Sequence, residues 1–225
     1  MYPHSHKNIK ILSEDNHIIV VVKPFNMPTQ ADSSHSPDLL STLKAYLKEK
    51  YNKPGNVFLG MVHRLDRPVG GLLVFAKSSK AAARLSNQIR LREFEKEYVA
   101  AVEGAITPKS RRLIHFILKD NMKNRVWAFD KEKPNAKKAE LEYKKIRAGD
   151  ETSLLNIRMV TGRKHQIRAQ LAAVGSPVVG DVKYGASAPL PGANILLYAT
   201  RLAFRHPVKK EPIDIRVDPP DDWPI

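Results

Sequence analysis

The chain of 225 residues contains no cysteine and no long hydrophobic run. Without cysteine, neither a disulfide framework nor a thiolate metal site can form. Residues 1–10 are polar, so a secretory signal peptide is not indicated, and nowhere do about 18 apolar residues follow one another as a membrane helix requires. These absences favour a protein that buries its own core in a reducing, cytoplasmic compartment and does not enter a membrane.

Several sequence motifs of enzymes are also missing. There is no GxSxG elbow, no Walker phosphate loop and no GxGxxG fingerprint, so a serine hydrolase, a nucleotide triphosphatase and a dinucleotide enzyme lose support. The chain has eight histidines, but none has the HxxH or HExxH spacing of a zinc site. Its acidic residues are scattered or adjoin lysines, unlike the clustered acids of a metal-dependent nuclease. We therefore predict no metal site.

Positive charge is abundant. Lysine and arginine number 38 against 23 acidic residues, which gives a net charge of +15. Basic side chains that face phosphates gain free energy through counterion release, so nucleic acid is the first candidate partner. The alternative is a basic surface that serves only solubility. The segment 207–225 is not basic, so the excess charge lies upstream of it.

The hydrophobic pattern predicts one compact domain over residues 1–225, because no repeat, low-complexity tract or long linker interrupts it. Helices are expected from Pro37-Asp38 to about residue 50, after Ser78 or Ser79, and around 167–174. The segment 121–138 is highly charged and is expected to form a mobile hairpin. Strands are expected at 17–23, 57–62, 72–76, 98–102, 113–118, 125–129, 139–147, 153–160, 194–204 and 213–217. This order predicts an α+β fold with a mixed, mainly antiparallel central sheet flanked by helices.

The first candidate functional motif is His63-Arg64-Leu65-Asp66-Arg67, which is followed by Gly70-Gly71 and an apolar run. It places one acid between two arginines on a glycine-bounded turn. A guanidinium within about 4–6 Å would favour the charged form of the Asp66 carboxylate, which would then act as a nucleophile rather than as an acid. The alternative is a simple turn residue, because aspartate and glycine are common in turns.

Two further motifs carry candidate residues. In the segment 96–104, Lys96 and Tyr98 share one face of a predicted strand, where the tyrosine could stack on a base. The segment 161–168, Thr-Gly-Arg-Lys-His-Gln-Ile-Arg, is expected to open a helix that carries Lys164 and Arg168 at i and i+4, away from its apolar side. Taken singly, Tyr98 could be an ordinary strand residue and Arg168 a helix-surface cation.

Together these segments resemble the RluA family of pseudouridine synthases. The chain differs from the common family pattern at Val69-Gly70-Gly71, where Thr-Ser-Gly is usual, and we expect this difference to alter loop packing but not chemistry. No separate amino-terminal RNA-binding module, as found in some family members, is expected before Glu14. The resemblance rests on segments in the family's order: Glu14 to Pro24, HRLDR at 63–67, KEYVAAVEG at 96–104, TGRKHQIR at 161–168, GSPVVGDVKYG at 175–185, and 202–207.

The resemblance implies a catalytic activity, a partner and a set of residue roles. Isomerisation of uridine to pseudouridine involves no redox change, so no cofactor is expected. The partner would be ribosomal or transfer RNA, bound by a monomer. Asp66 would be the nucleophile or base at the ribose, Tyr98 would stack on the flipped uracil and help to remove the C5 proton, and Arg168 would pair with Asp66. The residues expected to bind RNA are Arg64, Arg67, Lys96, Arg163, Lys164 and His165.

Two alternatives stay open from the sequence. A catalytically inactive RNA-binding homologue would share the sheet and the charge but would not need Asp66. A base-removing glycosylase would release free uracil and lower the mass of the RNA, whereas isomerisation leaves the mass unchanged.

Overall fold

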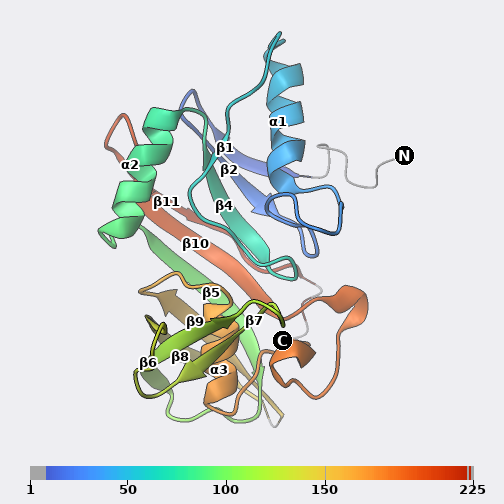
Figure 1. Cartoon of the computed structure of the whole chain (residues 1–225), viewed down its shortest axis with the longest axis vertical. Coiled ribbons are helices and arrows are strands. Elements are labelled where there is room, and N and C mark those ends of the chain that lie inside the picture. The colour runs from blue at the N-terminus through green and yellow to red at the C-terminus, as the bar shows by residue number, and fades with distance from the viewer. Residues whose placement is uncertain (1–8, 150, 222, 224–225) are drawn as a thin grey trace. The chain divides into compact units, whose positions relative to one another are not determined.

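The computed structural model describes residues 9–149, 151–221 and 223. The chain forms two compact units. Unit 1 comprises Met1–Phe94 and Arg201–Val217, and unit 2 comprises Glu95–Thr200 and Asp218–Ile225. Strand β10 (Leu197–Arg205) continues from one unit into the other along the chain. The expected catalytic domain therefore contains two units, each with its own strands and helices (Figure 1).

Unit 1 combines a mainly antiparallel sheet with two helices. Its strands follow the order β1-β2-β4-β10, while β11 pairs with β10 and β3 pairs with β4. Helices α1 and α2 lie beside these strands (Figure 1). The elements of unit 1 are β1 (Lys10–Glu14), β2 (Ile18–Lys23), α1 (Leu39–Lys50), β3 (Gly60–Met61), β4 (Gly70–Ala76), α2 (Ser79–Arg90), the end of β10 and β11 (Pro212–Arg216).

The core of unit 1 forms where β2 and β4 pair, because both strands are apolar on both faces. Val20 pairs with Val74 in this antiparallel register, and both are fully buried. Phe94 and Phe204 stack at 4.9 Å between ring centroids on the same cluster. Both helices begin where the sequence predicts, since Asp38 and Ser78 accept hydrogen bonds from the backbone amides of Ser41 and Ala81.

Unit 2 is a sheet in the order β10-β5-β9-β8-β6-β7, which leaves β7 at its edge. One face packs against α3, where Ile117, Val126 and Ala169 are buried together. In Figure 1, α3 passes behind β6 and β8. The elements are β5 (Glu95–Glu103), β6 (Ser110–Asp120), β7 (Arg125–Phe129), β8 (Lys137–Ala148), β9 (Thr152–Met159), α3 (Gln166–Ala173), the short 3-10 helices η2 (Val182–Tyr184) and η3 (Pro191–Ala193), and the start of β10.

The predicted α+β fold with a mainly antiparallel sheet and flanking helices is confirmed. Three details differ. The strand expected at 57–62 shrinks to Gly60–Met61, β4 starts at Gly70 rather than at residue 72, and β1 was not expected from its polar sequence. Within the described part of the chain, no helix has both the length and the apolar character needed to cross a membrane.

Candidate active site

Asp66 lies in unit 1, in the loop that joins β3 to β4, and its side chain is half-buried. Thr29 fixes the residue before it, because the Thr29 hydroxyl donates to the Leu65 carbonyl at 2.8 Å and accepts from the Leu65 amide at 3.3 Å. The Asp66 carbonyl closes a turn by accepting from the Val69 amide at 3.0 Å. The backbone is thus held on both sides of the carboxylate, as a preorganised catalytic group requires.

Lys23, at the end of β2, holds the other side of this loop. Its ammonium is fully buried and donates to the carbonyls of Pro24 and Met27, each at 2.8 Å, and to the carbonyl of Arg67 at 3.1 Å. Three acceptors match the three donors of a lysine ammonium. Burial lowers the pKa of Lys23 to about 7; the negative charge of Asp66 opposes this shift and Arg67 adds to it.

The two arginines that flank Asp66 differ in their contacts. The Arg67 guanidinium donates to the Asn26 carbonyl at 3.1 Å and to the Ser36 hydroxyl at 3.2 Å, so it ties the Asp66 loop to the segment after β2. Arg64 is exposed, and within the described residues its side chain takes part in no hydrogen bond or ion pair. Of the two predicted RNA contacts, Arg64 is therefore the more available.

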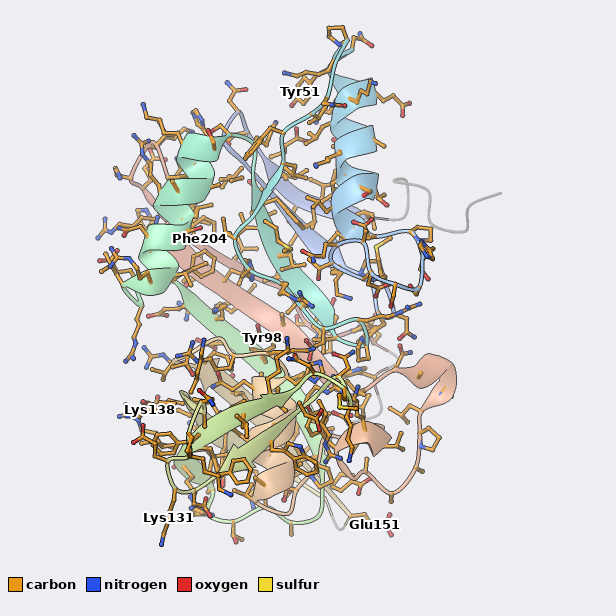
Figure 2. The ribbon with its side chains drawn as sticks, in the orientation of Figure 1. Tyr51, Tyr98, Lys131, Lys138, Glu151 and Phe204 are labelled. Atoms are coloured by element: carbon orange, nitrogen blue, oxygen red, sulfur yellow. The ribbon has the colours of Figure 1, made fainter. Side chains whose placement is uncertain are left out.

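Tyr98, labelled in Figure 2, and Lys96 lie on β5 of unit 2, and both are buried. They share one face of the strand, as the period of two predicts. Burial lowers the pKa of the Lys96 ammonium. A Cβ atom added to Gly162 would lie only 3.3 Å from Lys96 Nζ, so the glycine leaves room for this cation beside the segment 161–168.

Arg168 lies on α3. It is not a helix-surface cation, which was the alternative from the sequence, because it is only 5% exposed. Its Nε donates to one oxygen of Asp181 at 2.6 Å and its Nη2 to the other at 2.7 Å. Its guanidinium carbon also lies 4.9 Å from the centroid of the Tyr184 ring. Asp181 and Tyr184 thus fix the plane of this arginine.

The segment 161–165 corrects a second expectation. The helix starts at Gln166, after His165 in a left-handed conformation (φ 51°), so Lys164 precedes the helix and is not paired with Arg168 at i and i+4. Gln166 orders this loop: its side-chain oxygen accepts from the Thr161 hydroxyl at 2.8 Å and from the Arg163 amide at 2.9 Å. Loop geometry, rather than helix periodicity, positions these basic residues.

The three predicted RNA-binding residues of this loop contact other parts of unit 2. Arg163 Nε donates to the Lys138 carbonyl at 3.2 Å, and Lys164 bonds to the Asn124 side chain. The ring nitrogen Nδ1 of His165 lies 2.8 Å from the Tyr184 hydroxyl. Lys164 therefore lies beside the start of β7, and Arg163 lies beside the start of β8 (Lys137–Ala148).

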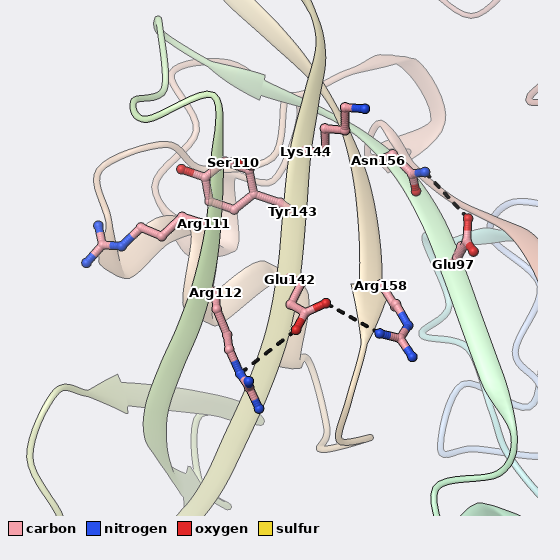
Figure 3. Close-up of a pocket in the computed structure, with 9 residues that line it drawn as sticks. All are labelled: Glu97, Ser110, Arg111, Arg112, Glu142, Tyr143, Lys144, Asn156 and Arg158. Atoms are coloured by element: carbon pink, nitrogen blue, oxygen red, sulfur yellow. Dashed lines mark hydrogen bonds and ion pairs between the residues drawn. The ribbon is translucent and has the colours of Figure 1, made fainter.

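A separate hollow of about 470 Å³ opens on unit 2. Figure 3 shows that its wall carries Arg112, Glu142 and Arg158, which alternate in sign on neighbouring strands. Glu142 accepts from Arg158 at 3.5 Å, and Arg112 lies 3.9 Å from Glu142. None of the predicted catalytic residues lines this hollow. Two of its four cationic side chains, Arg112 and Arg158, face Glu142, which makes the hollow a poorer anion site than its cations alone would indicate.

The predicted catalytic residues are thus divided between the units: Asp66 belongs to unit 1, while Tyr98 and Arg168 belong to unit 2. The pairing of Arg168 with Asp66 stays a prediction. Over residues 9–149, 151–221 and 223, no three histidine or acidic side chains gather as a metal site would require.

The sequence interpretation missed four residues that hold the candidate site, and one of them, Thr29, has no signal in the sequence. Lys23 had a signal, since it is a lysine at the end of an otherwise apolar strand. Asp181 and Tyr184 lie in the quoted segment 175–185, but nothing in the sequence shows that they would contact Arg168. Such long-range partners emerge only when α3 and η2 are placed together.

Comparison with known proteins agrees with the family resemblance of the sequence motifs. A family model described as RNA pseudouridylate synthase matches residues 17–173. The chain is 31% identical over 211 residues to the ribosomal large subunit pseudouridine synthase C of Vibrio vulnificus, covering 91% of this chain and 64% of that protein. It is 30% identical over 227 residues to the ribosomal large subunit pseudouridine synthase D of Zymomonas mobilis, covering 96% of this chain and 71% of the relative.

A similar fold occurs among solved structures. The human RNA pseudouridylate synthase domain containing 4 superposes with a TM-score of 0.78 at 21% identity, covering 95% of this chain and 90% of that one. At this identity the likeness concerns the fold alone. The chain also spans only about two thirds of the length of the bacterial relatives named above.

Proposed function

The chain belongs to the RNA pseudouridylate synthase family, and from this premise we propose that it converts specific uridines of RNA to pseudouridine. The observation that carries the proposal is the Asp66 loop, in which Thr29 and Lys23 fix the backbone on both sides of one carboxylate. A residue with no function beyond a turn would not need this support.

The chemistry needs few groups. The bond from ribose C1′ to uracil N1 breaks, the base turns, and a bond from C1′ to C5 forms while the C5 proton is lost to N1. Atoms and electrons balance without an oxidant or a reductant. Glycosidases use two carboxyl groups because an alcohol leaving group needs a proton. Uracil leaves as a delocalised anion, so one carboxylate suffices.

The residue roles follow from position and chemistry. Asp66 supplies the carboxylate that acts at the ribose or at the uracil ring. Tyr98 offers an aromatic face for the flipped uracil and a hydroxyl near the C5 proton. Arg168 pairs with Asp66, and its contact with Asp181 keeps the guanidinium oriented. Asp181 would thus be a positioning residue.

The proposal also concerns which RNA is the substrate. The names of the relatives favour RNA of the large ribosomal subunit, and transfer RNA is the second candidate. A ribosomal substrate favours the cytoplasm as the compartment, and the proposed residues all come from one chain, which supports a monomer as the active form. A target base must leave its stack at a cost of a few kcal/mol, which contacts with the basic surface would offset.

The deciding experiment maps pseudouridine by carbodiimide modification in ribosomal and transfer RNA. Three strains are compared: one with the intact gene, one without it, and one with the Asp66→Asn variant. We expect at least one uridine to be modified only in the first strain, which would also identify the substrate. Loss of uracil from the RNA would instead indicate a glycosylase, because isomerisation conserves mass.

Assays with purified protein separate catalysis from binding. Asp66→Asn should lower turnover on the order of 10³-fold or more while RNA affinity stays within a few-fold. Asp32→Asn is the matched control, since Asp32 is an exposed carboxylate in a neighbouring loop of unit 1, and it should keep full turnover. Equal activity of both variants would contradict the assignment of Asp66. Tyr98→Phe tests the hydroxyl, because it retains the aromatic face.

A further inference from the structure

An exposed aromatic residue stands out on the edge strand of unit 2. Arg125, Trp127 and Phe129 alternate along β7, so they lie about 7 Å apart on the same side of the strand. Trp127 is 40% exposed, although tryptophan is usually well buried. We call residues 116–129 the β7 hairpin, because they form the antiparallel pair of β6 and β7 with its turn.

Arg125 holds Trp127 in a defined orientation. Its guanidinium carbon lies 4.4 Å from the centroid of the Trp127 ring and 4.9 Å from that of the Tyr184 ring. Its Nε is buried and makes no hydrogen bond to any residue that the structure describes. The guanidinium therefore lies between two aromatic rings, and stacking rather than hydrogen bonding holds this part of it. An anchored indole loses little entropy when a ligand stacks on it.

The surroundings of Trp127 are basic. The segment 119–138 has seven lysines and arginines against three acidic residues, a net charge of +4. Lys133 Nζ lies 4.0 Å from the centroid of the Phe129 ring, Lys164 contacts Asn124 just before β7, and Arg163 contacts Lys138 at the start of β8. Figure 2 shows Lys131 and Lys138 at the periphery of unit 2. An exposed aromatic face thus lies in a segment of net positive charge, beside Asp120, whose side chain bonds to Trp127.

This combination matches one class of ligand better than others. Single-stranded nucleic acid is bound by aromatic faces that stack on bases and by cations that follow the phosphates. An apolar peptide would gain nothing from the surrounding lysines. The hollow in Figure 3 offers a contrast, because its Arg112 and Arg158 face Glu142 rather than an open ring.

We propose that Trp127 is a stacking site for an unpaired base of the RNA substrate that lies outside the target uridine's pocket, since β7 is the fourth strand from β5, which carries Tyr98. Lys133, Arg163 and Lys164 contact the phosphates that neighbour this base. The inference rests on the proposed function, which assigns the target uracil to Tyr98. It adds a second base contact that selects an unpaired nucleotide over a continuous duplex, and it gives the β7 hairpin a role in substrate choice.

Tryptophan fluorescence tests the contact directly, because the chain has only two tryptophans. Trp223 is 9% exposed, so Trp223→Phe leaves Trp127 as the only reporter, and Trp127→Phe leaves Trp223. The probe is a single-stranded oligouridylate of about 12 nucleotides, within the usual site size of a domain that binds single strands. We expect quenching in the Trp223→Phe protein and none in the Trp127→Phe protein. A duplex RNA of equal length should quench much less.

Affinity measurements separate stacking from folding. Trp127→Ala should raise the Kd for the oligouridylate about 5- to 100-fold, whereas Trp127→Phe, which retains an aromatic face, should raise it less than about 3-fold. Met122→Ala is the matched control, since Met122 is a fully exposed apolar residue of the same hairpin, and it should leave the Kd unchanged. Equal affinities for Trp127→Ala and Met122→Ala, together with no quenching, would overturn the proposal.

The same proteins distinguish failure of this inference from failure of the proposed function. Quenching measures binding without turnover. Quenching and a Trp127-dependent Kd in a protein that forms no pseudouridine would support the stacking site and contradict the proposed activity. Pseudouridine formation that is normal in both the parent protein and Trp127→Ala, with no quenching, would support the activity and overturn the stacking site.

Discussion

Two arginine–aspartate pairs, one in each unit, have nearly the same geometry in different surroundings. In unit 2, Arg168 donates through Nε and Nη2 to the two oxygens of Asp181 at 2.6 and 2.7 Å. In unit 1, Arg201 donates through the same two nitrogens to Asp214 at 2.8 and 2.7 Å. The carboxylate side chain of Asp181 is 1% exposed, whereas that of Asp214 is 47% exposed.

The difference in burial sets what each pair does. Water competes for the Asp214 carboxylate and screens its charge, so this pair adds little to stability. The Arg168 pair is out of water, and removal of one partner leaves a desolvated charge behind. Burial also gives the pair neighbours: Tyr184 lies against the Arg168 guanidinium and shares a hydrogen bond with His165. The buried pair can therefore orient a group for catalysis, while the exposed pair only links two strands.

The largest effect should come from breaking the buried pair. Asp181→Asn removes the negative charge but keeps the size of the side chain, and we expect it to lower the free energy of unfolding by about 3–5 kcal/mol. Urea unfolding followed by circular dichroism measures the change. Turnover of the folded variant should fall as well, because the orientation of Arg168 is lost. A loss below about 1 kcal/mol would show that burial does not separate the two pairs.

Lys23 is a second buried charge, but carbonyl oxygens hold it rather than a carboxylate. Lys23→Met should lower the free energy of unfolding by about 2–3 kcal/mol, because three buried carbonyls lose their donor. Lys80→Met on the exposed side of α2 is the matched control, and it should change stability by less than about 0.5 kcal/mol. Similar values for the two variants would contradict the role assigned to the Lys23 ammonium.

The lowered pKa of Lys23 also predicts that the free energy of unfolding depends on pH. Because the pKa of Lys23 is lowered from 10.5 to about 7, the unfolded chain binds more protons than the folded protein between these values. Stability from this group therefore rises with pH in that window, by about 2 kcal/mol between about pH 7 and pH 9. The measurable quantity is the difference in unfolding free energy between the parent protein and Lys23→Met. A difference that is constant or falls over this range would contradict the prediction.

Local patterns in the sequence are sufficient to predict most of the fold. The strand at 125–129 has the predicted bounds, and both capping residues, Asp38 and Ser78, start their helices as expected. The start of α3 was placed too early because the segment 161–165 is polar and helix-compatible, while the actual loop depends on hydrogen bonds from Gln166. Side-chain hydrogen bonds within this segment therefore override its preference for a helix.

The candidate catalytic residues could be predicted from the sequence, but the residues that hold them in place could not. Asp66, Tyr98 and Arg168 are visible as motifs, since each lies in a segment with a recognisable order. The partners Thr29, Lys23 and Asp181 lie 13 or more residues from the groups they hold. No local period connects such residues, so only the folded chain shows that they meet. Trp127 was missed as a candidate for the same reason, because its Arg125 and Tyr184 neighbours complete the stack.

The smallest effect should come from the exposed pair. Asp214→Asn keeps the shape of the side chain and should lower the free energy of unfolding by less than about 1 kcal/mol. Hydrogen bonds from Arg201 lower the pKa of Asp214, so this contribution is present above the ordinary pKa of an aspartate and is lost as the pH falls below it. Urea unfolding at neutral pH and near pH 3 should therefore show a small difference from the parent protein that shrinks in acid. A loss as large as that of Asp181→Asn would mean that bidentate geometry, rather than burial, determines the stability that such a pair contributes.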